Sequence, residues 1–302
     1  MSPTNVAAKT AALALLGSVA LAPNARAIPF NDLFVFGDSY SDTGAFFAGA
    51  NGPTAVGYMA QDLGITLTTP QNPDPGTSGV NFAESGARVA VGPTPPATHP
   101  LSLTQQVGEF QNYVTSGALT FNPNTSLFML LGGLNDHTAP ASGITAATAA
   151  QVSQLYALGA RYIEIGLLPN LSPAFADSAA NLNPAYTALV PQLQAEFPDA
   201  QITLSNWGPF YESVLSNAAQ YGFTNTDIAG CYDFTTNTQT CTTPDSYYFY
   251  YPSHPSTAVD RIVGNDLYQE ALAIRPVPEP VSVAILGTGL LGLGLTWRRK
   301  RG

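Results

Sequence analysis

A serine on a tight turn follows the first short apolar run beyond the N-terminal segment. The run, at 33–36, is Leu-Phe-Val-Phe, and such residues favour a short buried strand. Gly37, Asp38 and Ser39 come directly after it. Ligands of open α/β sheets bind beyond the carboxyl ends of the strands, so a serine at this place could be an exposed nucleophile. The same three residues also make ordinary turns.

A nucleophilic serine needs a base to take its proton and hydrogen-bond donors for the oxyanion. Three later segments contain candidates. Gly86 lies in Asn-Phe-Ala-Glu-Ser-Gly-Ala, Asn135 lies in Gly-Gly-Leu-Asn-Asp after the apolar run 127–131, and His254 precedes a proline near the end of the polar chain. Each residue also has a plain structural interpretation, since glycine forms turns and asparagine caps helices.

In this chain order the four residues resemble the Ser, Gly, Asn and His markers of the GDSL, or SGNH, hydrolase family. The resemblance covers roughly residues 30 to 272. It implies that Ser39 attacks an ester carbonyl to form an acyl-serine intermediate, while His254 acts first as base and then as acid. It also implies an oxyanion hole made by the backbone N–H groups of Ser39 and Gly86 and the side-chain amide of Asn135. Neither a cofactor nor a metal is expected.

Two positions depart from the family pattern. Tyr40 stands where the name-giving motif has leucine, and Tyr251 stands where the family usually has an aspartate that orients the histidine. Loss of such an aspartate in a serine protease costs about 10⁴ in rate. Three alternatives follow: a backbone carbonyl of Tyr251 or Pro252 orients His254 in a Ser-His dyad, Asp245 or another carboxylate replaces the aspartate, or the enzyme is slow or inactive. The dyad is favoured because nucleophile, base and oxyanion donors are all present.

The first 27 residues predict a secretory signal peptide. Lys9 precedes an apolar run at 11–22, and Ala-Arg-Ala at 25–27 fits a cleavage site. The alternative is a buried helix. The mature chain is therefore expected to begin at Ile28.

The end of the chain predicts a membrane-associated sorting signal. Residues 274–280 form a linker that ends in Pro-Glu-Pro, and 281–302 form an apolar helix with a basic tail. Seventeen uncharged residues, 281–297, are at the short end for a spanning helix, and the basic cluster marks the cytoplasmic side. This tail resembles the PEP-CTERM signal, which implies a Gram-negative envelope and an exosortase-like processing enzyme. An ordinary membrane anchor is the alternative.

The segment between the two ends is strongly acidic. All twenty Asp and Glu residues fall in 28–280, against four arginines and no lysine, which leaves a net charge of −16 there. Such a charge argues against nucleic acid or anionic lipid headgroups as partners.

Cys231 and Cys241 are the only cysteines. Outside the cell, two nearby cysteines favour a disulfide. A metal site needs more ligands than this pair offers.

The spacing of apolar residues predicts one α/β domain at 28–273. Apolar runs predict strands at 33–36, 127–131, 162–168 and 202–204. Helical spacing occurs at 55–63, 105–114, 146–158, 185–197, 210–221 and 258–272. Alternating strands and helices predict a mostly parallel sheet covered on both faces. The family resemblance implies the same: a three-layer α/β/α sandwich with a flavodoxin-like parallel sheet.

The expected function is a secreted serine esterase that hydrolyses carboxylic esters of lipids, aryl alcohols or O-acetylated carbohydrates. The alternative is a weak or inactive protein of the same fold that binds exopolysaccharide at the cell surface.

Overall fold

The computed structural model describes residues 30–44, 51–70, 78–90, 99–170 and 173–274. The predicted signal peptide (1–27), the linker beyond Ile274 and the predicted membrane helix with its basic tail (281–302) lie outside these ranges. Within the described ranges, no helix combines the length and the apolar character that a membrane crossing requires.

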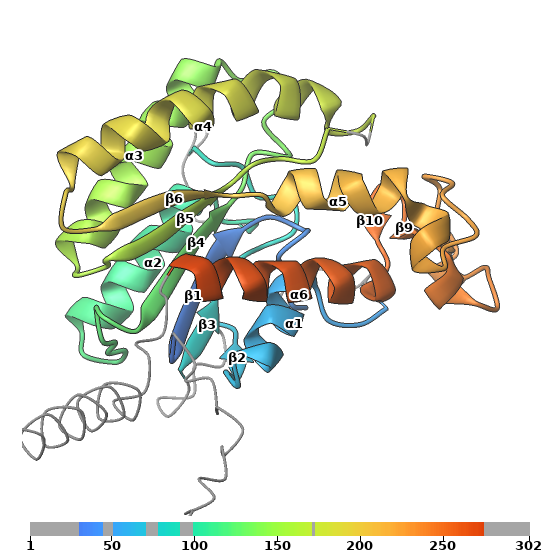
Figure 1. The fold of residues 1–302 in the computed structure, drawn as a ribbon, viewed down its shortest axis with the longest axis horizontal. Helices are drawn as coiled ribbons and strands as arrows, with labels where there is room; N and C mark the ends of the chain where they lie inside the picture. Colours follow the sequence, from blue (N-terminus) through green and yellow to red (C-terminus); the bar gives the residue numbers. More distant parts are fainter. Residues whose placement is uncertain (1–29, 45–50, 71–77, 91–98, 171–172, 275–302) are drawn as a thin grey trace, which may run out of the picture.

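Six parallel strands form the central sheet (Figure 1). In chain order they are β1 Asp32–Gly37, β2 Leu67–Thr68, β3 Gly79–Asn81, β4 Ser126–Leu131, β5 Tyr162–Gly166 and β6 Gln201–Ser205. Their spatial order is β2-β3-β1-β4-β5-β6. Apart from the short edge strand β2, this is the 2-1-3-4-5 order of flavodoxin-like folds, which confirms the predicted fold class.

The order of the strands reverses between β1 and β4. The two strands pair in parallel along their whole length, from Asp32 opposite Ser126 to Gly37 opposite Leu131. Every residue of β4 is buried, as expected for a strand covered on both faces. Because both strands end together, the segments that follow them leave the same edge of the sheet.

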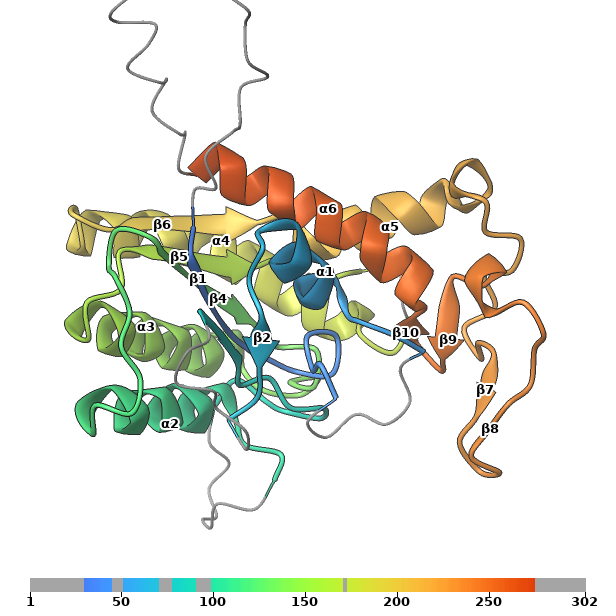
Figure 2. The ribbon, with the colours of Figure 1, turned by 90° about the horizontal axis from the view of Figure 1, so that it is seen from below.

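Four further short strands lie at one end of the molecule (Figure 2). They form two antiparallel pairs: β7 Tyr232–Asp233 with β8 Thr238–Gln239, and β9 Phe249–Tyr251 with β10 His254–Pro255. A disulfide joins Cys231 to Cys241 across the base of the β7–β8 hairpin, with Cα atoms 5.2 Å apart.

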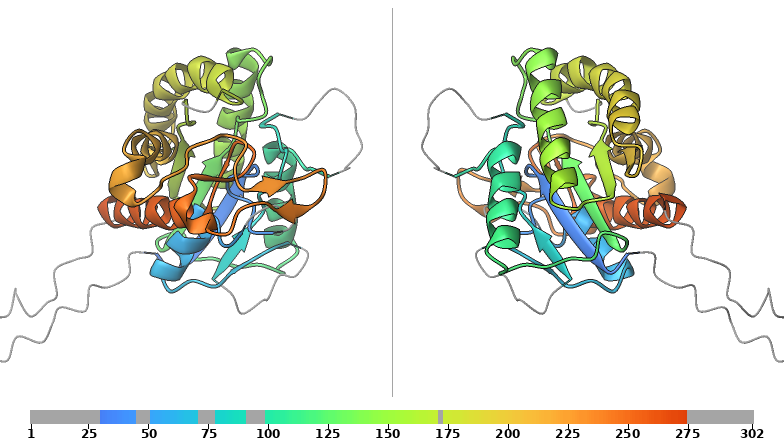
Figure 3. Two further views of the ribbon diagram at one scale, coloured as in Figure 1. Left: turned by 90° about the vertical axis from the view of Figure 1, so that its right-hand side faces the viewer. Right: turned by 90° about the vertical axis from the view of Figure 1, so that its left-hand side faces the viewer.

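Helices cover both faces of the central sheet (Figure 3). α1 and α6 pack together on one face, where α5 contacts α6, and α2, α3 and α4 pack in sequence on the other. Their bounds are α1 Ala55–Asp62, α2 Leu103–Thr115, α3 Ala141–Ala157, α4 Ala176–Glu196, α5 Trp207–Ser216 and α6 Thr257–Ile274.

The first and last helices approach each other very closely. A Cβ atom on Gly264 of α6 would lie 2.6 Å from the carbonyl oxygen of Ala55 and 2.6 Å from the Cβ of Tyr58, both on α1. Only glycine fits there without displacing backbone. The contact therefore holds the first and the last helix of the described chain in one layer.

The expected helix at 185–197 starts too late. α4 begins at Ala176 and contains Pro184 and Pro191. Proline is most often found in the first turn of a helix because it lacks an N–H, so the sequence around Pro184 gives no sign that the helix extends before it. The buried side chains of Ala179 and Leu182 show that the preceding turns are also packed on the core.

Candidate active site

Ser39 and His254 meet at the carboxyl edge of the sheet. Ser39 lies on the turn that follows β1, and His254 is the first residue of β10. The Ser39 Oγ and His254 Nε2 atoms are 2.8 Å apart, although 215 positions separate the two residues in sequence. This distance is within the range for proton transfer from a hydroxyl to an imidazole.

Two carboxylates hold the turn that carries Ser39. Asp38 accepts hydrogen bonds from the backbone N–H groups of Tyr40 and Leu134. Asp42 accepts from the N–H of Gly44 at 2.8 Å and from that of Ser85 at 2.9 Å. The turn is thereby fastened to the loop after β4 and to the loop after β3.

A backbone carbonyl orients the imidazole of His254. Its Nδ1 lies 2.8 Å from the carbonyl oxygen of Pro252. A carbonyl only accepts hydrogen bonds, so Nδ1 carries the proton and Nε2 of the neutral ring is free to accept one from Ser39. The edge of the Tyr251 ring packs against the imidazole, with centroids 5.4 Å apart. The structure thus places a carbonyl at the atom that the family's aspartate usually contacts.

Asp245, the other candidate for orienting the base, lies elsewhere. It belongs to the 3₁₀ turn Pro244–Ser246, and its side chain is exposed. The hydrogen bonds described for His254 go to Pro252 and Ser39 and not to Asp245. The structure does not bring this carboxylate to the imidazole.

Burial shapes the protonation of the base. It lowers the pKa of His254 below its usual value of 6.5, and the hydrogen bond to the Pro252 carbonyl opposes part of this shift. Burial disfavours the imidazolium because the charged ring loses its hydration. His254 is therefore neutral, as a base must be, over a wider pH range than an exposed histidine.

The three expected oxyanion donors come from neighbouring strand ends. Ser39 follows β1, Gly86 follows β3, and Asn135 follows β4. One amide hydrogen of Asn135 goes to the carbonyl oxygen of Ala87 at 2.9 Å, which joins two of the loops and leaves the second hydrogen available. Within the described part of the chain, the N–H groups of Ser39 and Gly86 donate to no protein acceptor.

The backbone of Gly86 has a φ of +85°, a value that favours glycine. A buried carboxylate two residues earlier holds this loop. Glu84 is 2% exposed; it accepts a hydrogen bond from the N–H of Leu101 at 2.6 Å and lies 2.9 Å from Nδ1 of His99. This pair was not predicted from the sequence. The only sign of it in the sequence was a glutamate inside the motif that contains Gly86. Its partner, His99, lies in a separate loop, so no sequence spacing relates the two residues.

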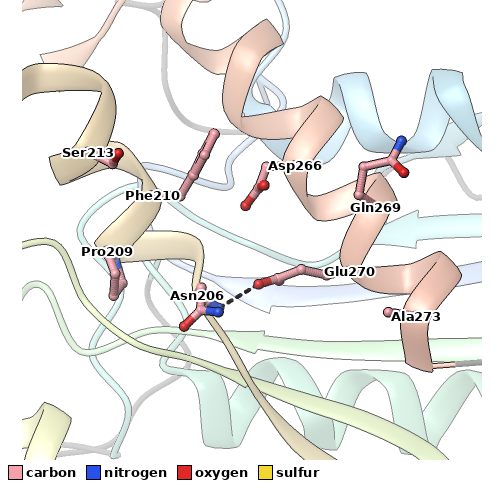
Figure 4. A pocket seen from close by; sticks show the side chains of 8 residues that line it. All are labelled: Asn206, Pro209, Phe210, Ser213, Asp266, Gln269, Glu270 and Ala273. Atoms are coloured by element: carbon pink, nitrogen blue, oxygen red, sulfur yellow. Dashed lines mark hydrogen bonds between the residues drawn. The ribbon is translucent and has the colours of Figure 1, made fainter. Parts of the chain in front are cut away.

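A large hollow lies away from this site, between α5 and α6 (Figure 4). Its volume is about 500 Å³, and it is lined by Asn206, Pro209, Phe210, Ser213, Asp266, Gln269, Glu270 and Ala273. Neither Ser39 nor His254 contributes to it. Glu270 accepts hydrogen bonds there from Ser205 Oγ and from the N–H of Asn206. The lining of this open hollow is mostly apolar, and the hollow does not include the nucleophile.

In the described ranges, no three His, Cys, Asp or Glu side chains are grouped so that they could hold a metal ion. The two cysteines are already used in the disulfide. The polar groups around Ser39 suit acyl transfer, in which a hydroxyl, an imidazole and N–H donors suffice.

This chain is similar to several known proteins. A family model described as GDSL-like Lipase/Acylhydrolase matches residues 33–267. Acetylajmalan esterase 2 of Rauvolfia serpentina is 26% identical over 288 residues, covering 69% of this chain and 79% of that protein. GDSL esterase/lipase APG of Arabidopsis thaliana is 25% identical over 292 residues, covering 78% and 82%. A solved structure from Veillonella parvula DSM 2008, a member of the lipolytic protein G-D-S-L family, is 14% identical with a TM-score of 0.44, covering 79% of this chain and 96% of that one.

Proposed function

The chain belongs to the GDSL-like lipase/acylhydrolase family and is an ester-bond hydrolase, and on this basis we propose that it acts through a Ser-His dyad formed by Ser39 and His254. The observation that carries the proposal is the 2.8 Å contact between Ser39 Oγ and His254 Nε2. The hydrogen bond from His254 Nδ1 to the Pro252 carbonyl supports it, since this bond fixes the required tautomer.

The reaction begins when Ser39 Oγ attacks the ester carbonyl carbon and gives its proton to Nε2 of His254. The carbonyl oxygen becomes an oxyanion that accepts hydrogen bonds from the N–H groups of Ser39 and Gly86 and from the amide of Asn135. Nε2–H then protonates the leaving alcohol as the carbon–oxygen bond breaks, which leaves an acyl group on Ser39. A water molecule, deprotonated by His254, releases the acid and restores the serine.

The described hydrogen-bond acceptor for Nδ1 of the imidazolium formed during attack is the Pro252 carbonyl, which is not a carboxylate. The Pro252 carbonyl supplies the negative end of a dipole at that position, 2.8 Å away. A dipole stabilises a cation less than a full charge does, so the dyad should be slower than a triad of the same geometry. The same arrangement avoids the desolvation of one more buried carboxylate.

We assign the substrate to carboxylic esters, with acyl groups on a sugar polymer favoured. The predicted signal peptide and sorting signal support export to a Gram-negative envelope, processing by an exosortase-like enzyme and anchoring through residues 281–302. The acidic composition does not favour anionic lipids. The relatives named above are esterases, one of them an acetylajmalan esterase.

A second candidate function rests on Tyr251, which occupies the usual aspartate position. In that case the fold binds a surface polysaccharide without catalysis. A fluorophosphonate probe separates the two functions, because it reacts only with an activated serine. Labelling of the wild type that disappears in Ser39→Ala supports the esterase, and an unlabelled wild type supports the binding protein.

The direct test is hydrolysis of p-nitrophenyl esters from acetyl to long-chain acyl groups. Ser39→Ala and His254→Ala should each lower kcat by about 10⁴ or more. Ser116→Ala is the matched control, because Ser116 is exposed at the end of α2 and only donates to the carbonyl of Tyr113. Turnover that persists in Ser39→Ala would exclude the proposed mechanism.

A further inference from the structure

A row of aromatic rings leads from the molecular surface to the base. Phe234, on the hairpin between β7 and β8, is 63% exposed. Its ring contacts Tyr251 at a centroid distance of 6.0 Å, and Tyr251 contacts His254 at 5.4 Å. Phe234 is thus separated from the base by a single ring.

The hairpin that carries Phe234 projects from the end of the molecule (Figure 2) and is fastened at its base. The Cys231–Cys241 disulfide closes it, and the N–H of Cys231 donates to the carbonyl of Tyr250 on β9 at 2.7 Å. Tyr232 packs on the Tyr251 ring at 5.8 Å. A ring that is exposed on a segment fixed in this way is presented to solvent in a defined position, which lowers the entropy lost when a ligand binds.

The position of the rings defines the part of the substrate that they can reach. His254 must protonate the leaving oxygen, so the alcohol portion of the ester lies beside the imidazole. The acyl portion points its carbonyl oxygen toward the donors on Ser39, Gly86 and Asn135. Tyr251 packs on the imidazole and Phe234 packs on Tyr251, so the two rings extend from the group that protonates the alcohol portion.

We propose that Phe234 and Tyr251 form a subsite for a neutral pyranose ring in the alcohol portion of the ester. The proposal rests on the proposed function and specifies its substrate as an acylated, uncharged glycan. One face of a pyranose presents C–H groups, which pack on aromatic rings through apolar contact, while its hydroxyls point outward from the rim.

The surroundings of Phe234 fit this ligand in two ways. The hairpin carries exposed hydroxyl and amide groups at 235–239 that can bond sugar hydroxyls; Thr236 Oγ1 and Thr238 Oγ1 are 2.8 Å apart.

The charge around Phe234 also suits a neutral ligand. Residues 231–251 contain Asp233 and Asp245 but neither lysine nor arginine. Hydrogen bonds from the backbone of Thr235 and Thr236 lower the pKa of Asp233, so it stays charged and disfavours anionic ligands such as phospholipid headgroups. An alkyl chain would instead need an enclosed apolar channel.

The test compares two substrates of different alcohol size. Partially acetylated xylotetraose reaches the proposed subsite, whereas the ethyl group of ethyl acetate is too small. The measured quantity is the ratio of kcat/KM for the oligosaccharide to kcat/KM for ethyl acetate. Phe234→Ala and Phe234→Leu should each lower this ratio about tenfold, because both remove the flat ring, and Phe234→Trp should retain it. Tyr221→Ala is the matched control, since Tyr221 is 42% exposed and outside the hairpin.

The outcomes separate the two proposals. If the wild type hydrolyses ethyl acetate and the ratio is unchanged in Phe234→Ala, the subsite is refuted and the esterase stands. If Phe234→Leu retains the ratio of the wild type, the position contributes only apolar bulk and the sugar subsite is likewise refuted. Calorimetric titration with unacetylated xylotetraose does not depend on turnover: its affinity should fall about tenfold in Phe234→Ala. A wild type that binds this probe but hydrolyses neither substrate would retain the subsite and refute the esterase.

Discussion

The Oη of Tyr40 donates a 2.6 Å hydrogen bond to the carbonyl oxygen of Ser253. Tyr40 follows Ser39 and Ser253 precedes His254, so this bond lies beside the contact of nucleophile and base, one residue later in the first segment and one residue earlier in the second. Ser253 has a φ of +61°, which is uncommon for serine, and its N–H is bonded to the carbonyl of Ile228. The tyrosine that replaces the motif leucine thus helps to hold the strained residue before the base.

Tyr40→Phe should lower kcat about five- to tenfold, with KM nearly unchanged. The variant keeps the buried ring but removes one hydrogen bond, which is worth about 1 kcal/mol and here keeps His254 in reach of Ser39. Steady-state kinetics with p-nitrophenyl acetate measure the change. Tyr113→Phe is the control, because it removes a hydrogen bond to the Pro70 carbonyl away from the site. An unchanged kcat would mean that the Tyr40 bond does not position the base.

Asn135→Ala should lower kcat by about 10² to 10³. The amide of Asn135 is expected to bond the oxyanion, which exists only in the transition state and the tetrahedral intermediate, so KM should change little. Asn181→Ala makes the same chemical change on α4, where the side chain only donates to the Ala139 carbonyl. A loss that appears in KM and not in kcat would assign Asn135 to substrate binding.

Tyr251→Asp should leave the turnover of ethyl acetate unchanged or raise it, because the Pro252 carbonyl already orients His254. The Tyr251→Asn variant separates the effects, since it also removes the ring but adds no charge. A faster aspartate variant would show that the dyad lacks a counter-charge for the imidazolium. A large fall in both variants would assign a catalytic role to the tyrosine ring.

The pH profile should extend to acidic pH. Only neutral His254 acts as a base, and burial lowers its pKa, so kcat/KM should fall only at a pH below the usual histidine value of 6.5. The measurement is kcat/KM for ethyl acetate from pH 4 to 9, with the pH stability of the protein followed in parallel. A half-maximal rate above pH 6.5 would contradict the expected direction of the shift.

Asp38 should make the folded state less stable as the pH rises. Its burial raises the pKa from 3.8 to about 7. The folded state therefore binds a proton that the unfolded state has released between these values, and stability that is present below 3.8 is lost as the pH rises through 7. The shift corresponds to a loss on the order of 4 kcal/mol. Denaturant unfolding from pH 4 to 8 should show a smaller decline in Asp38→Asn than in the wild type; equal declines would refute the assignment.

Local patterns predicted the elements that position the site. The continuous apolar runs of β1 and β4 are typical of strands covered on both faces. Each run is followed by polar residues, which are suited to the carboxyl edge of the sheet. The order of the strands placed Ser39 and Asn135 at the point where the direction of winding reverses. The motifs around Ser39 and Asn135, together with the rule that ligands bind where the winding reverses, were sufficient to predict where these two residues lie in the fold.

Contacts between distant segments could not be predicted in the same way. The sequence left both a backbone carbonyl and a carboxylate open as the group that orients His254, because the local path of Pro252 and Ser253 decides between them. The pair Glu84–His99 depends on how a loop folds back, and the exposure of Phe234 depends on how a hairpin docks on β9. Neither relationship has a periodic pattern in the sequence, and β3 is too short to give one.

The close packing of Gly264 against Ala55 has a consequence for biosynthesis. The nucleophile is translated early, whereas the base and the helix that covers α1 come near the end of the described chain. A nascent chain, or a fragment, that ends before residue 254 contains the complete turn after β1 but lacks the base. Hydrolysis by Ser39 and His254 can therefore begin only after the late segment that carries the base has reached the nucleophile.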